Sequence, residues 1–215
     1  MMTLQLVIKD FILVKKQALF MLVLAAAIPL FVMSRVPTIP SVIAFIYCVT
    51  FVELIIIQAI GAIEGKHPKA TALLCATPYS RKSVVLAKYI FFLLLFVYCY
   101  AVFSILGLLV PTIGTVSLTV VLSVLLGGII IYGTFLPFYF KYDFEKTKYF
   151  FMVVIFVIAF GSPMLANQLS GVNIDISVLN TMPTATLNII ILLASIAILF
   201  ISVMLSMRIF SKKEL

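Results

Sequence analysis

Charge is scarce in this sequence, and tryptophan is absent. Only 10% of the 215 residues are charged, whereas a soluble domain carries about 25% charged residues. Apolar residues make up 65% of the chain, and the mean hydropathy is +1.32. A folded chain with so few polar groups cannot cover its apolar surface in water. The composition therefore excludes a soluble globular fold and predicts an all-α integral membrane protein.

Histidine and cysteine are also rare, which excludes several kinds of chemistry. His67 is the only histidine, so neither an H-E-x-x-H zinc site nor a Ser-His-Asp arrangement can be assembled. The cysteines, Cys48, Cys75 and Cys99, form no CxxC pair and are typical of small buried hydrophobes. The glycines of Gly61–Lys66 are one residue too close for a phosphate loop. We therefore expect no catalytic residue, metal or cofactor in this chain, and an intramembrane enzyme is disfavoured.

The basic residues lie mainly at the ends of apolar runs. The formal net charge is +8, from 15 Lys and Arg against 7 Asp and Glu. No basic patch is interleaved with aromatic residues, so we expect no nucleic-acid partner. Basic residues at the ends of apolar runs instead meet anionic lipid headgroups. Membrane lipids are thus the first partner that the sequence predicts.

Six apolar runs have the length of membrane-spanning helices, and we treat residues 1–215 as one transmembrane domain. The expected spans are about 18–35, 41–61, 89–110, 116–138, 149–166 and 185–207. Before them, residues 3–16 carry apolar side chains at Leu4, Val7, Ile8 and Phe11, interrupted by charges. That spacing favours an amphipathic helix in the membrane interface. A plain cytoplasmic leader is the alternative.

The distribution of basic residues predicts the orientation in the cell membrane. The terminal segments, the interval Gly61–Lys88 and the short charged segment 141–148, expected as a loop, hold 14 of the 15 Lys and Arg. Only Arg35 falls on the opposite side. By the positive-inside rule, both termini and the interval Gly61–Lys88 are cytoplasmic. The polar segment 167–183 is then an extracellular loop.

Two features inside the expected spans bear on function. Glu53 is an intramembrane carboxyl group, which needs a partner, water or a proton. It either lines a substrate path or packs against another helix, bonded to Gln58 or to a neighbouring subunit. The small residues Ser123 and Gly127, at a spacing of four, together with Gly128 and Gly133, favour close approach of another helix.

The interval between the second and third spans resembles a known pattern. It contains a glutamate, a leucine pair, a proline, Ser-Arg and a Lys-Tyr entry into the third helix. These residues are Glu64, Leu73, Leu74, Pro78, Ser80, Arg81, Lys88 and Tyr89, with Tyr79 and Val84 between them. This order resembles that of small bacterial permeases of the ABC-2 type. Ala76-Thr77-Pro78 departs from the usual leucine-proline. In topology the resemblance covers the whole chain, and in sequence about 25 residues of it.

The resemblance implies a permease subunit of an ATP-binding cassette exporter without an ATPase site of its own. ATP and Mg would be bound by separate cytoplasmic ATPase subunits, and a second permease chain, identical or homologous, would complete the path. The segment from about Glu64 to Lys82 would form a coupling helix on the ATPase, with apolar anchors and charged flanks. The contacting residues would be Glu64, Lys66, His67, Lys69, Leu73, Leu74, Tyr79, Ser80 and Arg81.

The cargo is less closely defined by these residues. A Lys- and Ile-rich, tryptophan-free composition resembles permeases of Gram-positive bacteria that export amphipathic peptides, such as phenol-soluble modulins or bacteriocins. An apolar path with few charges suits amphipathic or lipid-like cargo. The alternative function is a membrane immunity or accessory protein that binds a partner and transports nothing. Co-purification of an ATP-binding protein distinguishes the two hypotheses.

Overall fold

The computed structural model describes residues 2–35, 41–66, 80–110, 113–156 and 183–212. Every regular element in these ranges is an α-helix. The helices are α1 (Met2–Leu13), α2 (Lys15–Arg35), α3 (Ser41–Lys66), α5 (Arg81–Leu109), α6 (Leu118–Phe156) and α9 (Thr184–Ser211). The expected all-α fold is therefore confirmed for the described residues.

Four of these helices are long and apolar enough to cross a membrane. They are α3, α5, the part Leu118–Tyr142 of α6, and α9. The pair α1 and α2, bent by 83° at Val14, adds a fifth candidate crossing if it is counted as one broken span. The chain is thus a multi-pass membrane protein, and the described residues account for four or five of the six expected crossings.

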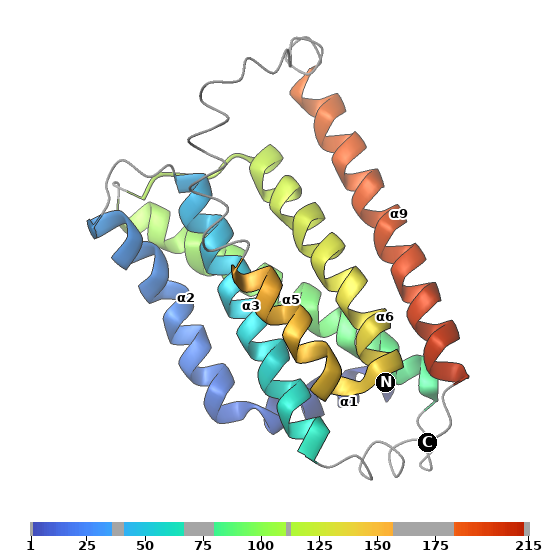
Figure 1. The fold of residues 1–215 in the computed structure, drawn as a ribbon. Helices are drawn as coiled ribbons and strands as arrows, with labels where there is room; N and C mark the ends of the chain where they lie inside the picture. Colours follow the sequence, from blue (N-terminus) through green and yellow to red (C-terminus); the bar gives the residue numbers. More distant parts are fainter. Residues whose placement is uncertain (1, 36–40, 67–79, 111–112, 157–182, 213–215) are drawn as a thin grey trace.

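α1 turns away from α2 at the bend and packs beneath the bundle (Figure 1). Leu4, Ile8 and Phe11 are exposed on its outer face, whereas Val7 and Asp10 are buried against the other helices. An amphipathic helix at a large angle to a spanning helix is the geometry expected for an interfacial element. The structure therefore shows two faces of α1: an outer face of exposed apolar residues and an inner face that is buried against the bundle. The sequence pattern alone assigns Val7 to the same face as Leu4 and Ile8.

The bundle core is built mainly from aromatic and β-branched side chains of α3, α5 and α6. Phe45 meets the rings of Phe96 and Phe103 edge to face, with centroids 6.3 and 5.1 Å apart. Such pairs are the preferred aromatic geometry in protein interiors. Cys48 and Cys99 are free and buried, as expected, and Cys75 lies outside the described residues.

The charged segment 141–148 is helical, so its prediction as a loop was wrong. α6 continues through it to Phe156, and Figure 1 shows the helix changing direction sharply beyond its spanning part. The reason is a buried face: Phe140, Phe144 and Thr147, spaced i, i+4 and i+7, are only 4–8% exposed. The ring of Phe144 lies directly over Gly61 of α3, where a Cβ atom would collide with it. The segment 141–148 is thus an amphipathic stretch of helix, whose many charged residues led to its prediction as a loop.

Two further boundaries differ from the expected ones. α5 begins at Arg81, eight residues before the expected start at Tyr89, because Ser80 caps it: its hydroxyl oxygen accepts the Ser83 backbone N–H at 3.1 Å. Of the expected span 149–166, the part up to Phe156 belongs to α6, and the remainder lies outside the described residues. The expected extracellular loop 167–183 also lies outside them, apart from Pro183.

Candidate functional site

Four helices meet at a buried cluster of charges close to the end of α3 and the start of α5. Lys88 of α5 lies at the centre, with its Nζ atom 2.8 Å from Glu64 Oε1 of α3 and 3.1 Å from Asp10 Oδ2 of α1. Lys9 Nζ lies 2.9 Å from Asp10 Oδ1, an ion pair without hydrogen-bond geometry, and 3.5 Å from Glu64 Oε1. Tyr139 of α6 donates its hydroxyl to Glu64 Oε2 at 2.6 Å.

The charges of this cluster balance. Lys9 and Lys88 oppose Asp10 and Glu64, so the formal charges cancel. The side chains of Asp10 and Lys88 are only 2% and 8% exposed. Ions removed from water in this way are tolerated only when opposite charges and hydrogen bonds replace their hydration. The cluster therefore fixes the relative positions of α1, α3, α5 and α6.

A second polar network starts at the next residue of α5 and extends to α9. The Tyr89 hydroxyl lies 2.5 Å from Ser202 Oγ and 2.9 Å from Ser206 Oγ. Ser202 Oγ also donates to the backbone carbonyl of Gly133 in α6 at 2.7 Å. Because Lys88 and Tyr89 are neighbours on α5, a displacement of this turn would be felt in every other helix that the two networks touch.

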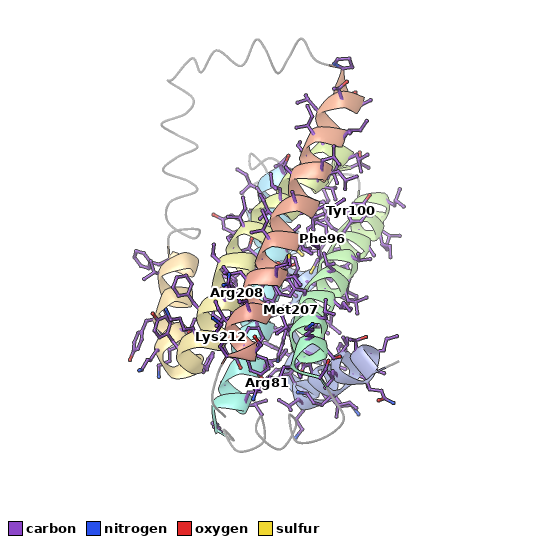
Figure 2. All side chains as sticks on the ribbon, turned by 90° about the vertical axis from the view of Figure 1, so that its right-hand side faces the viewer. Arg81, Phe96, Tyr100, Met207, Arg208 and Lys212 are labelled. Atoms are coloured by element: carbon purple, nitrogen blue, oxygen red, sulfur yellow. The ribbon has the colours of Figure 1, made fainter. Side chains whose placement is uncertain are left out.

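Arg81 ties the first turn of α5 to the end of α9. Its Nη1 atom donates to the carbonyls of Phe210 and Ser211, at 3.3 and 2.9 Å. These carbonyls belong to the last turn of α9, where carbonyl groups lack the usual partner one turn further along the helix. Figure 2 shows Arg81 at the same end of the bundle as Arg208 and Lys212 of α9.

The geometry is that of a mechanical junction between helices. Among the described residues, no group of three or more His, Cys, Asp and Glu side chains could hold a metal ion. The two ends of the segment 67–79 are held instead, by Glu64 on one side and by Arg81 and Lys88 on the other. A displacement of either end would therefore act on α1, α3, α5 and α6 through the charge cluster, and on α9 through Arg81.

The comparison with known proteins agrees with this architecture. A family model described as ABC-2 family transporter protein matches residues 5–211, from the first helix to the last. The chain belongs to the ABC-2 family. The resemblance inferred from the sequence is thereby confirmed, and a permease role is supported for this ABC-2 protein. No curated protein and no solved structure matches the chain.

Four of the nine predicted ATPase-contacting residues of the ABC-2 protein lie within the described part of the chain, and five lie outside it. Lys66 is exposed at the end of α3, but Glu64 points into the charge cluster, Ser80 caps α5 and Arg81 binds α9. The others lie outside the described residues: His67, Lys69, Leu73, Leu74 and Tyr79. Glu64, Ser80 and Arg81 are therefore placed to hold the ends of the segment.

Of the charge cluster, sequence reasoning predicted only Glu64 as a site residue; it named Lys88 only in the family pattern and missed the other three members. The sequence pattern places Lys9 and Asp10 in an interfacial helix, and Tyr139 just after the end of a span. The available signal was Asp10 itself, which is the only acidic residue before Glu53. A lone carboxylate in an apolar amphipathic helix needs a cation, and Lys88 provides it across 3.1 Å.

Glu53 and Gln58, which were expected either to line a substrate path or to pack together, line different cavities in the ABC-2 protein. Glu53 lines a cavity of about 360 Å³ between α3 and α6, whereas Gln58 lines a different cavity beside α2. Glu53 is 4% exposed, and its Oε1 atom forms no hydrogen bond with any described residue. Of the expected small-residue contacts, Gly133 packs against Ser202, but a Cβ atom at Gly127 would have no described residue within 4 Å.

Proposed function

We propose that the chain is the permease subunit of an ATP-binding cassette exporter, powered by separate cytoplasmic ATPase subunits that bind ATP and Mg. The observation that carries the proposal is the charge cluster, in which Glu64, before the segment 67–79, contacts Lys88, after it. An ATPase that presses on this segment would move Glu64 and Lys88, and with them α1, α3, α5 and α6.

The proposed orientation places both termini and the segment 67–79 in the cytoplasm, with the protein in the cell membrane. In Figure 1 the start of α1 and the end of α9 lie at one end of the molecule, close to the end of α3. Gathering these basic segments at one end supports the orientation expected from the positive-inside rule. Two permease chains, identical or homologous, would enclose the path.

We further propose amphipathic or lipid-like cargo, including cytolytic or antimicrobial peptides, moved outward. The described parts of the spanning helices present mostly apolar side chains, and Glu53 is the acidic residue deepest in them. Cargo with an apolar face could enter such a protein from the membrane. A strongly charged, fully hydrated solute would meet too few polar groups to replace its water.

The docking of the ATPase can be tested at the two leucines that the resemblance places in the coupling helix. The double variant Leu73→Ala, Leu74→Ala should reduce co-purification of the ATPase by at least about tenfold, since buried apolar anchors dominate interface energies. Its control is Leu108→Ala, Leu109→Ala, an exposed leucine pair at the opposite end of α5, where alanine adds no charge to the span. The measurements are the amount of bound ATPase and its rate of ATP hydrolysis.

Membrane insertion and the thermal unfolding midpoint should be equal for both double variants. If the Leu73, Leu74 variant inserts normally and still binds and stimulates the ATPase, the docking assignment is wrong. Arg81→Ala is unsuitable for this purpose, because Arg81 also caps α9 and its loss would alter the fold.

A further inference from the structure

The cavity beside Glu53 is a long, narrow slot between two spanning helices. α3 lines it with residues from Val42 to Ile57, and α6 with residues from Thr119 to Tyr132, mostly at spacings of three and four. Figure 1 shows α3 and α6 descending through the bundle in the same direction. The lining therefore spans roughly 22 Å along α3, at 1.5 Å per residue. Its walls are almost entirely apolar, with hydroxyl groups only at Thr50, Thr119, Ser123 and Tyr132.

Glu53 is the feature that distinguishes this slot from an ordinary packing defect. The carboxyl group is 4% exposed, and its Oε1 atom makes no hydrogen bond to the described part of the chain. A buried carboxyl oxygen without a hydrogen-bond partner destabilises the fold, because its lost hydration is not replaced. Because Glu53 lines an apolar slot, a ligand with a hydrogen-bond donor would supply the partner that its carboxyl oxygen lacks.

The open side of the slot is built from small residues of α6. A Cβ atom at Gly127 would have none of the described residues within 4 Å, and Ser123 is exposed. Gly128 lies opposite Glu53, where a Cβ atom would stand 3.6 Å from Oε2. A larger residue at either glycine would fill the space next to the carboxyl group. The sequence thus leaves room at the place where a donor group could reach Glu53.

The slot is too small to enclose a helix. A helix about 10 Å wide with a rise of 1.5 Å occupies roughly 120 Å³ per residue, so the slot would hold only about three helical residues. Its volume of about 360 Å³ is instead within the range of small-molecule sites. A single extended alkyl chain fits this shape, with apolar walls along its length and one polar contact at Glu53.

We propose that this slot binds a single-chain amphiphile that carries a primary amine. The ammonium group would donate to Glu53 and neutralise it, which a hydroxyl or carboxylate head could not do. The inference rests on the proposed function and deepens it, since it names the class of lipid-like cargo that this slot would take.

The slot is also joined to the charge cluster through its inner wall. Tyr132 lines the slot, and its hydroxyl donates to the backbone carbonyl of Lys88 at 3.1 Å. Its ring stacks on Phe92, with centroids 4.6 Å apart. A ligand that displaces Tyr132 would therefore act on the same turn of α5 that holds Glu64 and Asp10. This contact gives a route by which occupancy of the slot could reach the ATPase-binding end.

The test uses the purified chain in lipid nanodiscs, without an ATPase. A dodecylamine with a photoreactive diazirine near the end of its chain is crosslinked, and the labelled peptides are mapped by mass spectrometry. Labelling should fall on residues 42–57 and 119–132. Unlabelled dodecylamine should compete at least about tenfold better than dodecanol, because a charge-assisted hydrogen bond is roughly twice as strong as a neutral one; lauric acid should compete least.

Three variants separate the parts of the proposal. Glu53→Gln should keep the labelling and remove the preference for the amine over the alcohol. Gly127→Leu should fill the slot and abolish the labelling, whereas Gln58→Leu, in the other cavity, should change neither. Equal competition by dodecylamine and dodecanol in the unmodified chain, or labelling that is insensitive to Gly127→Leu, would overturn the proposal. Because no ATPase is present, such a failure leaves the permease role untouched, and loss of ATPase binding would leave this result standing.

Discussion

Replacing Lys88 by methionine should destabilise the protein by about 3–5 kcal/mol, the usual cost of removing one partner from a buried ion pair. Lys88 contacts both Glu64 and Asp10, and its side chain is 8% exposed. Its loss would leave Lys9 as the only cation that the described residues place against the two carboxylates. The measurement is the thermal unfolding midpoint of the purified protein in detergent, followed by circular dichroism.

A second substitution tests whether charge balance is the cause. The double variant Lys88→Met, Asp10→Asn leaves one cation and one carboxylate, so it should recover part of the stability lost by Lys88→Met. Lys82→Met is the matched control, because Lys82 is exposed on the same helix and should change stability by less than about 0.5 kcal/mol. Equal destabilisation by the single and double variants would show that packing of the lysine stem, and not its charge, holds the helices.

Gly133→Leu should also be strongly destabilising, whereas Gly127→Leu should not. A Cβ atom at Gly133 would stand 3.0 Å from Ser202 Oγ and 3.2 Å from Ser202 Cβ, so a leucine would force α6 away from α9. Overpacking of this kind costs about 1–3 kcal/mol or more, and it would also disturb the contact of Ser202 with Tyr89. At Gly127 no described residue lies within 4 Å of the added Cβ atom, and a leucine there gains roughly 0.8 kcal/mol in helix propensity.

The two leucine variants differ by six positions on one helix, so each is a control for the other. Unfolding midpoints and the yield of monodisperse protein are the measurements. If both variants are equally destabilised, Gly127 packs against another helix in the purified protein, and the open slot between α3 and α6 does not exist in that form.

The membrane class and most helices of this fold could be predicted from hydropathy and from the distribution of basic residues. The spacing of prolines and polar segments places α3 and the spanning part of α6 to within a few residues. The pattern fails at 141–148, because five of its eight residues are charged. The buried position of Phe144 depends on its packing against α3, which the sequence pattern does not reveal. So many charges in a short segment indicate solvent exposure when the neighbouring helix is not known.

The candidate site was only partly accessible to sequence reasoning, for a similar reason. Glu64 and Lys88 stand out as charges beside apolar runs, but their separation of 24 positions does not reveal a contact of 2.8 Å. Asp10 is further still from Lys88 in the chain and joins it only because α1 bends back beneath the bundle. Glu53 was identifiable as an intramembrane carboxyl group, whereas its separation from Gln58 required the orientation of both side chains.

The most direct test of the permease role is the isolation of the tagged, unmodified chain from its native membranes in a mild detergent. We predict that an ATP-binding cassette ATPase co-purifies with it, that the complex hydrolyses ATP, and that the chain freed from its partner does not. Recovery of the chain with a different membrane partner and without any ATPase would contradict the permease role and favour an immunity or accessory protein.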